Sequence, residues 1–334
     1  MTSTENKIPI KGYAGFHPLK HCMIGRGFNH EHLKEFFKDP KILEPMKKIA
    51  DQTEEDFETL DDILQKAGVK TYRANLNLSK YESIDKIYRP PLTPRDHFGV
   101  IGETFYATKS VQGYSNVLKQ IDKDQLFIRP KDKDYTGTVD TASILRAGKD
   151  LYWGYNPKDG DPKEYVDLFK QQGFRVHLVE RDYHSDAVIS LIKPGVAISV
   201  KDIANYKNTM PGWEVLLIDD NPVLPFTPDH KNLIKGRWWI DGEENNLKLA
   251  NFIDKWLHEW VGFVAESVFD VNMLSIDENT VICNNYNKSV FDFLKKHKVE
   301  PVLYNFRHRY FFDGGVHCIT QDLYREGKQE DYFG

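Results

Sequence analysis

The sequence lacks any long apolar run. No stretch of its 334 residues approaches the ~20 consecutive apolar residues that span a bilayer as a helix. Residues 1–12, MTSTENKIPIKG, contain no apolar segment of the kind that a signal peptide requires. The chain also lacks an excess of positive charge, because 45 basic and 50 acidic side chains leave a net charge of −5. Such a balance gives no basic surface for binding nucleic acid or an anionic membrane. We therefore expect a cytoplasmic protein that binds neither nucleic acid nor membrane.

Cysteine is scarce, since the chain has only Cys22, Cys283 and Cys318. This odd and sparse set argues against a disulfide framework and for a reducing compartment. Metal and cofactor signatures are also missing. His30 and His32 stand without the further Cys or His residues of a zinc site, and the nearby GRGFNH lacks the third glycine of a dinucleotide fingerprint. The sequence thus predicts no cofactor and no bound metal.

The chain does contain a repeated pattern, in which an amphipathic helix is followed by a breaker and a short β-rich run. The four copies are LDDILQKAGVKTYRA (60–74), YVDLFKQQGFRVHLVE (165–180), NYKNTMPGWEVLLID (205–219) and SVFDFLKKHKVEPVLYN (289–305). Further β-rich runs stand between them, namely KHCMIG (20–25), FGVIG (98–102), AVISLI (187–192) and NTVICN (279–284). Such recurrence indicates a repeated supersecondary unit. Its long, irregular spacing favours blades closed around one deep central pocket, but a doubly wound α/β sheet fits the same pattern.

No low-complexity segment or Gly/Ser linker divides the chain, so we expect residues 1–334 to form one domain. The Trp-rich stretch 224–262 breaks the rhythm of the repeat. It contains an apolar stripe at helical spacing, made of Leu247, Leu249, Phe252, Ile253, Trp256, Leu257 and Trp260. We interpret this stretch as an inserted helix packed on the body, or as part of a lid.

Cys318 stands in FFDGGVHCITQDLYREG (311–327), shortly after two glycines. Gly314 and Gly315 permit backbone conformations that are closed to other residues, and close approach of a ligand. A thiol here becomes a nucleophile only if a neighbouring cation or base lowers its pKa. The commoner alternative is a buried, inert thiol. That is our interpretation of Cys22 and Cys283, which lie in apolar, strand-like runs.

Acids and bases precede several predicted strands. His184 and Asp186 are two residues apart before AVISLI, so an extended segment would point them to the same side. They suit acid/base work and cation binding, or they form a solvated loop. Asp140 occupies a helix N-cap position, or it orients a histidine as the acid of a triad does. Asp96 follows three prolines at the start of a strand and by itself indicates only a turn.

These motifs occur together and in one order along nearly the whole chain. They are TPRD (93–96), DTASILRAGKDLY (140–152), HSDAVISLIKPG (184–195), VNMLSIDENTV (271–281) and GGVHCITQDLYREG (314–327). With them the chain resembles the amidinotransferases of the guanidino-group-modifying pentein superfamily, most closely the glycine amidinotransferase type. The Arg-Ala-Gly block and the Gly-Gly-x-His-Cys block are the specific parts of the resemblance.

The resemblance implies a five-bladed, pseudo-symmetric α/β propeller with a central active-site pocket. Cys318 matches the nucleophile, His184 the general acid/base and Asp140 its orienting partner. Asp96 and Asp186 match the carboxylates that hold the donor guanidinium. The implied reaction moves an amidino group from L-arginine to Cys318, releases L-ornithine, and then passes the group to an amine acceptor. The family also suggests a homodimer.

Departures from the family pattern fall on substrate recognition. Glycine-using members carry an arginine that grips the donor carboxylate where this chain has Ile203. Lys201 is the nearest replacement, but it lacks the bidentate fork. Glu266 stands where the family has a small hydroxyl residue, which suggests that the substrate carries a cationic group. Tyr183 is bulkier than a binding site for glycine as acceptor would need. With Arg146 of the Arg-Ala-Gly block, these residues are our substrate-binding candidates, and we expect an acceptor larger than glycine.

Two other functions fit the same residues. One is a deiminase-like or dimethylargininase-like hydrolase, which releases the amidino carbon as citrulline or urea-type products. The other is a catalytically silent propeller that serves as a binding module. The joint retention of Cys318, His184 and Asp140 favours an enzyme, and exclusion of water from the intermediate favours transfer over hydrolysis. Residues 224–262 are the candidate screen against water.

Overall fold

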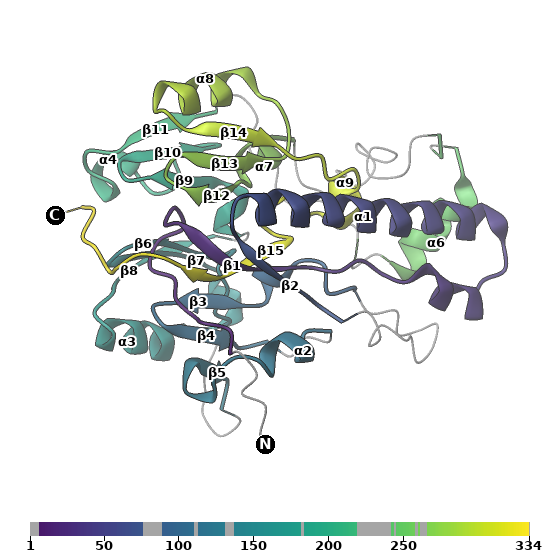
Figure 1. Ribbon diagram of the computed structural model, residues 1–334, viewed down its shortest axis with the longest axis horizontal. Helices are drawn as coiled ribbons and strands as arrows, with labels where there is room; N and C mark the ends of the chain where they lie inside the picture. The colour runs from purple at the N-terminus through teal and green to yellow at the C-terminus, as the bar shows by residue number, and fades with distance from the viewer. Residues whose placement is uncertain are drawn as a thin grey trace.

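The computed structural model describes residues 7–75, 89–109, 113–130, 137–181, 184–218, 242–243, 245–257, 260 and 266–333. Within these ranges the chain forms five three-stranded sheets. The sheets gather on one side of the molecule in Figure 1, and a long helix runs out to the other side.

Every sheet repeats one strand pattern. A middle strand pairs antiparallel with an inner strand and parallel with an outer strand. In the order inner, middle, outer, the blades are β15 (Thr320–Arg325), β1 (Leu19–Ile24), β2 (Lys70–Arg73); β3 (Gly99–Ile101), β4 (Thr104–Ala107), β5 (Leu126–Ile128); β6 (Ile144–Ala147), β7 (Asp150–Tyr155), β8 (Arg175–Glu180); β9 (Ile189–Lys193), β10 (Val196–Ser199), β11 (Glu214–Leu217); and β12 (Leu274–Asp277), β13 (Thr280–Cys283), β14 (Glu300–Leu303).

A helical crossover joins the middle strand to the outer strand of each blade, as parallel pairing requires. The crossovers contain α1 (Pro40–Lys66), α2 (Ser115–Leu118), α3 (Lys163–Gln171), α4 (Tyr206–Thr209) and α8 (Lys288–Lys296). The other described helical segments are η1 (His30–Glu35), η3 (Pro94–Asp96), η4 (Lys123–Gln125), η5 (Pro157–Asp159), η6 (Ser185–Ala187), α6 (Leu247–Trp256), α7 (Glu266–Val271) and α9 (Arg309–Phe312). Among the described residues, no helix is long and apolar enough to cross a membrane.

The four predicted helix–breaker–strand copies are confirmed, and the structure adds a fifth. The breakers Gly68, Gly173, Gly212 and Lys298 all have positive φ, between +59° and +85°. The fifth unit contains α2 and β5. Its helix has four residues, as does α4 of the third copy, so neither shows a full amphipathic stripe. Five separate sheets rule out the doubly wound alternative, which needs one continuous sheet.

The N-terminal and C-terminal parts of the chain meet in one blade. β15 comes from the C-terminal part and supplies the inner strand beside β1, with Ile24 opposite Thr320 and Cys22 opposite Asp322. This pairing closes the propeller. It also places Cys318, two residues before β15, next to the loops of the other blades.

The segment after Asp140 is not helical, so the predicted helix N-cap is wrong. The Asp140 Oδ1 accepts a hydrogen bond from the Ser143 amide at 2.8 Å and caps a turn instead. The chain then enters the β6–β7 hairpin, whose turn uses Gly148 at a φ of +65°. Apolar side chains on both strands are buried against neighbouring blades, and this burial outweighs the local capping signal.

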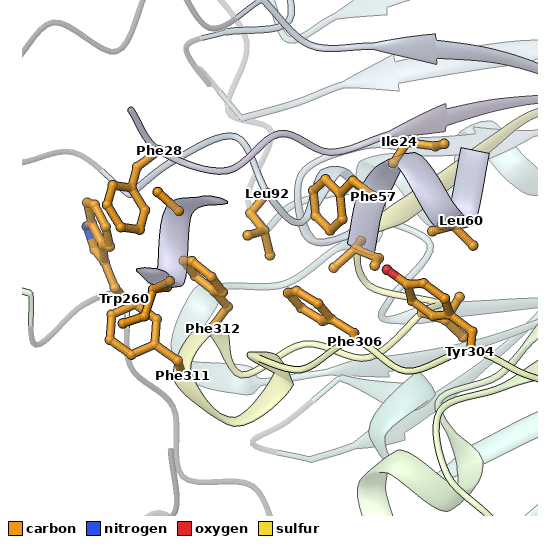
Figure 2. Close-up of a cluster of buried hydrophobic side chains, with 14 of the residues drawn as sticks. Ile24, Phe28, Phe57, Leu60, Leu92, Trp260, Tyr304, Phe306, Phe311 and Phe312 are labelled. Atoms are coloured by element: carbon orange, nitrogen blue, oxygen red, sulfur yellow. The ribbon is translucent and has the colours of Figure 1, made fainter. Parts of the chain in front are cut away.

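The long helix α1 covers the first blade and extends beyond it (Figure 1). Its apolar face is buried in a cluster that joins the helix to β1 and the fifth blade. Figure 2 shows Phe57 and Leu60 of α1 close to Phe306 and Tyr304. The Tyr304 hydroxyl donates a hydrogen bond to the Asp56 carbonyl at 3.0 Å, so α1 is held by polar as well as apolar contacts.

Much of the predicted insertion at 224–262 lies outside the described residues. The described part includes α6, which confirms the helical stripe over its length. Leu249 and Phe252 are buried, whereas Leu247 is 72% exposed. The Phe252 ring lies 4.5 Å from that of Phe37, so α6 packs on the region around α1. The roles of this stretch as an insertion or a lid stay predictions.

Candidate active site

One short loop in each blade comes directly before the inner strand, and these five loops meet. Each carries one side chain of the candidate site. In chain order they are Asp96, Asp140, Asp186, Asn272 and Cys318. All five are at least nine-tenths buried. The site is therefore built from residues that are far apart in the sequence but equivalent in the repeat.

Hydrogen bonds link each loop to the next and close a ring. Going round from the second blade, these bonds are Thr141 N to Phe98 O (3.0 Å), Asp186 N to Ala142 O (3.0 Å), Asn272 Nδ2 to Asp186 O (3.3 Å), His317 N to Asn272 Oδ1 (3.1 Å) and Arg95 Nε to His317 O (2.7 Å). Every link joins neighbouring blades. The position of each site residue is thus set by all five.

Cys318 sits on a tight turn held by two asparagines. A side chain on Gly315 would place its Cβ 2.5 Å from the Asn272 Oδ1 and 2.8 Å from the Asn284 Nδ2. Gly315 is therefore needed for close approach, as expected, although the neighbour is the protein and not a ligand. Neither Gly314 nor Gly315 has a positive φ, so the predicted special backbone conformation is wrong, and Asp313 adopts it instead at +54°.

The thiol of Cys318 has one polar donor and one carboxylate at close range. The Asn272 Nδ2 donates to Sγ at 3.1 Å, and the thiol faces the Asp186 Oδ2 at 3.6 Å. Burial and the charges of Asp186 and Asp96 raise the pKa of the Cys318 thiol well above its ordinary 9.0. The hydrogen bond from Asn272 lowers this pKa but does not outweigh them. These surroundings therefore favour the protonated thiol. Cys22 and Cys283, as expected, are buried thiols whose pKa burial raises to about 12.

His184 lies at the N-cap of η6 and not in an extended strand, so the period-two argument for its side chain is wrong. Its Nδ1 is nevertheless 3.6 Å from the Asp96 Oδ1. Burial disfavours the charged imidazole, but the carboxylates of Asp96, Asp140 and Asp186 outweigh it and raise the pKa of His184. The ring is thus poised to hold a proton beside the site.

Asp140 contacts groups other than an imidazole in this arrangement. Its Oδ1 accepts the Ser143 amide, and its Oδ2 lies 3.8 Å from the Lys109 Nζ. Lys109 also donates to the Asp96 carbonyl at 2.7 Å, so it bridges the loops of two blades. The predicted role of Asp140 in orienting His184 remains a prediction that rests on their electrostatic interaction.

Two further residues belong to the site and were missed from the sequence. The His317 Nδ1 lies 2.8 Å from the Asp186 Oδ2. Burial and the nearby Arg95 lower the pKa of His317 to about 4, so the neutral ring donates to the carboxylate and holds it. Asn272 is the second. No local signal marks an asparagine in VNMLSID, but its place directly before an inner strand would have found it once the repeat was aligned.

The remaining substrate-binding candidates lie in different surroundings. The Arg146 guanidinium pairs with Asp322 and donates to the Val100 carbonyl, so it faces the interior. Lys201 is exposed after β10. Glu266 begins α7, with its side chain outside the description, and Tyr183 lies outside the described residues. In the described ranges, no group of Cys, His, Asp and Glu has an arrangement that would hold a metal ion.

Five ββαβ blades closed around a buried thiol and several carboxylates define the pentein class of α/β propellers, as the motifs implied. Among solved structures, the fold is similar to that of an amidinotransferase from Microseira wollei (TM-score 0.70, 17% identity, 97% of this chain and 100% of that chain) and of inosamine-phosphate amidinotransferase from Streptomyces griseus (0.67, 16%, 97% and 99%). A dimethylarginine dimethylaminohydrolase has a TM-score of 0.54 at 10% identity, over 90% of this chain and 98% of that chain.

In sequence the chain is similar to curated amidinotransferases, although no family model matches it. It is 25% identical over 210 residues to mitochondrial glycine amidinotransferase from Xenopus tropicalis, and 23% identical over 208 residues to L-arginine:L-lysine amidinotransferase from Pseudomonas savastanoi pv. phaseolicola. Each match covers 60% of this chain. The matched region is 42% of the length of the glycine amidinotransferase and 48% of that of the lysine enzyme, so the chain spans under half the length of these curated relatives. The resemblance to amidinotransferases and the five-bladed fold are confirmed.

Proposed function

We propose that this protein is an amidinotransferase. It moves the amidino group of L-arginine to an amine acceptor through a covalent intermediate on Cys318, and it releases L-ornithine. One observation carries the proposal, namely a buried thiol 3.6 Å from the Asp186 carboxylate, with Asp96 and Asp140 of two further blades at the same site. The sequence similarity to amidinotransferases supports the same chemistry.

A guanidinium suits this site by charge and by shape. It is a planar cation whose N–H groups bind carboxylates through paired hydrogen bonds. The Oδ1 atoms of Asp96 and Asp186 are buried and have no hydrogen-bond partner among the described residues. Although burial opposes ionisation, His184, Arg89 and His97 lower the pKa of Asp96, so its carboxylate is charged and ready to accept. These two oxygens are the proposed donor ligands.

The donor's charge also activates the nucleophile. A guanidinium between Asp96 and Asp186 offsets the charges that hold the proton on Cys318, and thereby favours the thiolate. Sulfur then bonds to the amidino carbon, the carbon–nitrogen bond to the departing amine breaks, and the thiol proton reaches that amine through His184. A neutral acceptor amine next attacks the same carbon, the carbon–sulfur bond breaks, and the acceptor's proton returns to sulfur.

A guanidino hydrolase is the second candidate, because a dimethylarginine dimethylaminohydrolase shares the fold. In both reactions sulfur bonds to the guanidino carbon, but hydrolysis to citrulline breaks the bond to a terminal nitrogen, which leaves as ammonia, before water attacks. Transfer breaks the bond to the ornithine nitrogen and leaves the amidino group on sulfur for the amine. Supply of guanidino-labelled arginine with and without a panel of amines separates them. Transfer predicts ornithine formation that depends on the amine. Citrulline as the main product would contradict transfer and support hydrolysis.

The covalent intermediate has its own test. After mixing with arginine alone, mass spectrometry should find an amidino adduct on Cys318, and an adduct on Cys22 or Cys283 instead would refute the assignment. Cys318→Ser should reduce turnover at least roughly 10⁴-fold with an unchanged circular dichroism spectrum. Cys283→Ser, the same change at a buried thiol outside the site, should keep turnover. If Cys318→Ala matched the wild type, the binding-module alternative would gain.

We extend the proposal to the acceptor, an amine larger than glycine that carries a second cationic group. The support is the chain's own Glu266 and Tyr183 and the absence of the family's arginine at Ile203, whose side chain is half-buried between two apolar clusters. A relative whose name specifies L-lysine as acceptor uses such an amine. Lysine-like diamines should outperform glycine in the acceptor panel, and Glu266→Gln should remove that preference.

A cytoplasmic location and a homodimer are further proposals that rest on the sequence resemblance. Fractionation of the source cells tests the first. Sedimentation equilibrium of the purified chain tests the second, and a single monomeric species would contradict it.

A further inference from the structure

A second buried site lies in the centre of the propeller. A cavity of about 30 Å³ is lined by residues of the inner strands β6, β9 and β12 and of the loops before them. Arg95, Asp186 and His317 line it together with Arg146, Ser190 and Ser275. Cys318, His184, Asp96 and Asp140 are not among its lining residues. The cavity therefore adjoins the candidate site through Asp186 and His317, but the sulfur does not line it.

Positive charge exceeds negative charge in a buried cluster to which two residues that line the cavity, Arg95 and Arg146, belong. The guanidinium groups of Arg95, Arg146 and Arg325 all converge on one carboxylate, that of Asp322. The Asp322 Oδ1 lies 2.8 Å from the Arg95 Nη1, its Oδ2 lies 2.9 Å from the Arg325 Nε, and the Arg146 Nη2 pairs with Oδ2. All four residues are at most 4% exposed. Three cations and one anion leave a surplus of two, and Asp186 reduces it to one. A buried charge without a partner is costly.

In this cluster, the Arg95 guanidinium has one nitrogen without a hydrogen-bond partner among the described residues. The Arg95 Nε donates to the carbonyls of His317 and Thr320, at 2.7 and 2.9 Å. Its Nη1 contacts Asp322 and the Thr141 hydroxyl. Its Nη2 is buried and has no hydrogen-bond partner among the described residues. A buried cationic donor of this kind calls for an acceptor.

Two buried histidines lie near this cluster and stay neutral. Burial, followed by the charges of Arg325 and Arg146, lowers the pKa of His17 to about 4. Burial and Arg95 lower the pKa of His317, which lines the cavity, to about 4. Both rings are neutral at physiological pH, so neither adds a proton to an already positive centre.

We propose that the central cavity binds one small monovalent anion, such as chloride, through the Arg95 Nη2 and the hydroxyls of Ser190 and Ser275. Its volume of about 30 Å³ holds about two waters or one such ion. The anion would offset the remaining charge. Because the Arg95 Nε holds the carbonyls of His317 and Thr320 on either side of Cys318, the occupant also braces the nucleophile's turn. The inference does not depend on the amidinotransferase reaction.

Bromide identifies the occupant directly. Crystals of the full chain are soaked in sodium bromide, and anomalous scattering is measured at the bromine edge. The expected result is a peak in the cavity within hydrogen-bond reach of the Arg95 Nη2. Ordered water alone at that position, bridging Arg95 and the Asp186 Oδ1, would overturn the proposal, as would peaks only on the outer surface.

Thermal melts supply a second readout in solution. At constant ionic strength, replacing gluconate by chloride should raise the melting temperature by roughly 2–5 °C and should saturate, because an ion that binds only the folded state stabilises it by mass action. Equal melting temperatures in the two salts would contradict the proposal.

A charge-replacement variant distinguishes the site from general salt effects. Ser275→Asp supplies a tethered carboxylate at the cavity wall. It should remove both the bromide peak and the chloride dependence, and it should melt in gluconate at or above the wild type. Ser289→Asp, the same change at an exposed position, should retain the chloride dependence. If both variants respond to chloride as the wild type does, the stabilising ion lies elsewhere and the proposal fails.

Discussion

At the scale of single residues, the charge state of Cys318 rests on a balance of few contacts. Burial acts most strongly against the thiolate, followed by the carboxylates of Asp186 and Asp96, whereas the Asn272 amide and the Gly315 backbone act for it. Asn272 is 1% exposed, and its Oδ1 accepts the His317 backbone N–H, which fixes the amide with its Nδ2 toward sulfur. Asn272 is therefore a side chain that both holds the Cys318 turn and favours the thiolate.

Asn272→Asp tests this balance, because it preserves the size and the acceptor oxygen and replaces the donor by a negative charge. We expect the pKa of the Cys318 thiol to rise further and site-resolved alkylation by iodoacetamide at pH 8 to slow by about tenfold or more. If the transfer reaction is as proposed, its kcat/KM should fall by roughly 10²–10³. Asn156→Asp, at a turn cap where either residue serves, is the control. If Cys318 were alkylated in Asn272→Asp at the wild-type rate, this role of Asn272 would be excluded.

At the scale of elements, the repeat shows how strongly local backbone demands direct the sequence. Gly68, Gly173 and Gly212 follow their helices with positive φ, where glycine carries no steric penalty. The fourth copy places Lys298 in the same conformation, at +59°. This lysine carries the strain that the glycines avoid, since left-handed backbone costs other L-residues roughly 1–2 kcal/mol.

The two kinds of breaker give opposite predictions. Gly68→Ala should destabilise the fold by about 1 kcal/mol, and the cause is the backbone alone because a Cβ there meets nothing within 4 Å. Lys298→Gly should stabilise the fold by up to about 1 kcal/mol. This change is the strain energy that glycine relieves, minus the larger conformational entropy that glycine loses on folding. Urea unfolding midpoints of the two variants measure both changes. Shifts of the same sign would contradict this account.

At the scale of the whole molecule, closure of the propeller buries neutral histidines. Burial, with neighbouring arginines, lowers the pKa of His17, His308 and His317 from 6.5 to about 4. Between these values the unfolded chain binds more protons than the folded one, so stability is fully present above pH 6.5 and is lost as pH falls toward 4. His184, whose pKa is raised, acts in a different range: its contribution is fully present below pH 6.5 and is lost as the pH rises through its folded pKa, so it leaves this slope unchanged.

We therefore expect the free energy of unfolding to decrease between pH 6.5 and 4, by at most about 1.4 kcal/mol per pH unit for each buried histidine. His308→Gln removes one of these groups, whose Nε2 contacts the Gln52 Oε1 at 2.9 Å, and should make the dependence shallower. Chemical unfolding at a series of pH values measures the slopes. A stability that is flat over this range, or an unchanged slope in the variant, would contradict the prediction.

Much of the fold was predictable because its units are local. The helix–breaker–strand copies are set by the spacing of apolar residues and by one breaker each, all within about twenty residues of sequence. The order of the motifs around Asp96, Asp140, His184, Asp186 and Cys318 likewise named the candidate site before any contact was known. The expectation of a helix after Asp140 failed because burial of the β6–β7 hairpin against other blades outweighs a local cap.

Only the tertiary structure decided how the named residues meet. The contact of Asn272 with Cys318, the pairing of His317 with Asp186, the approach of His184 to Asp96 and the burial of Arg146 against Asp322 each join different blades. None of these contacts leaves a periodic trace in the sequence, because each depends on five repeated units closing into a ring. The sequence by itself determined the blades and the chemical groups they carry, and ring closure determined which of those groups face one another.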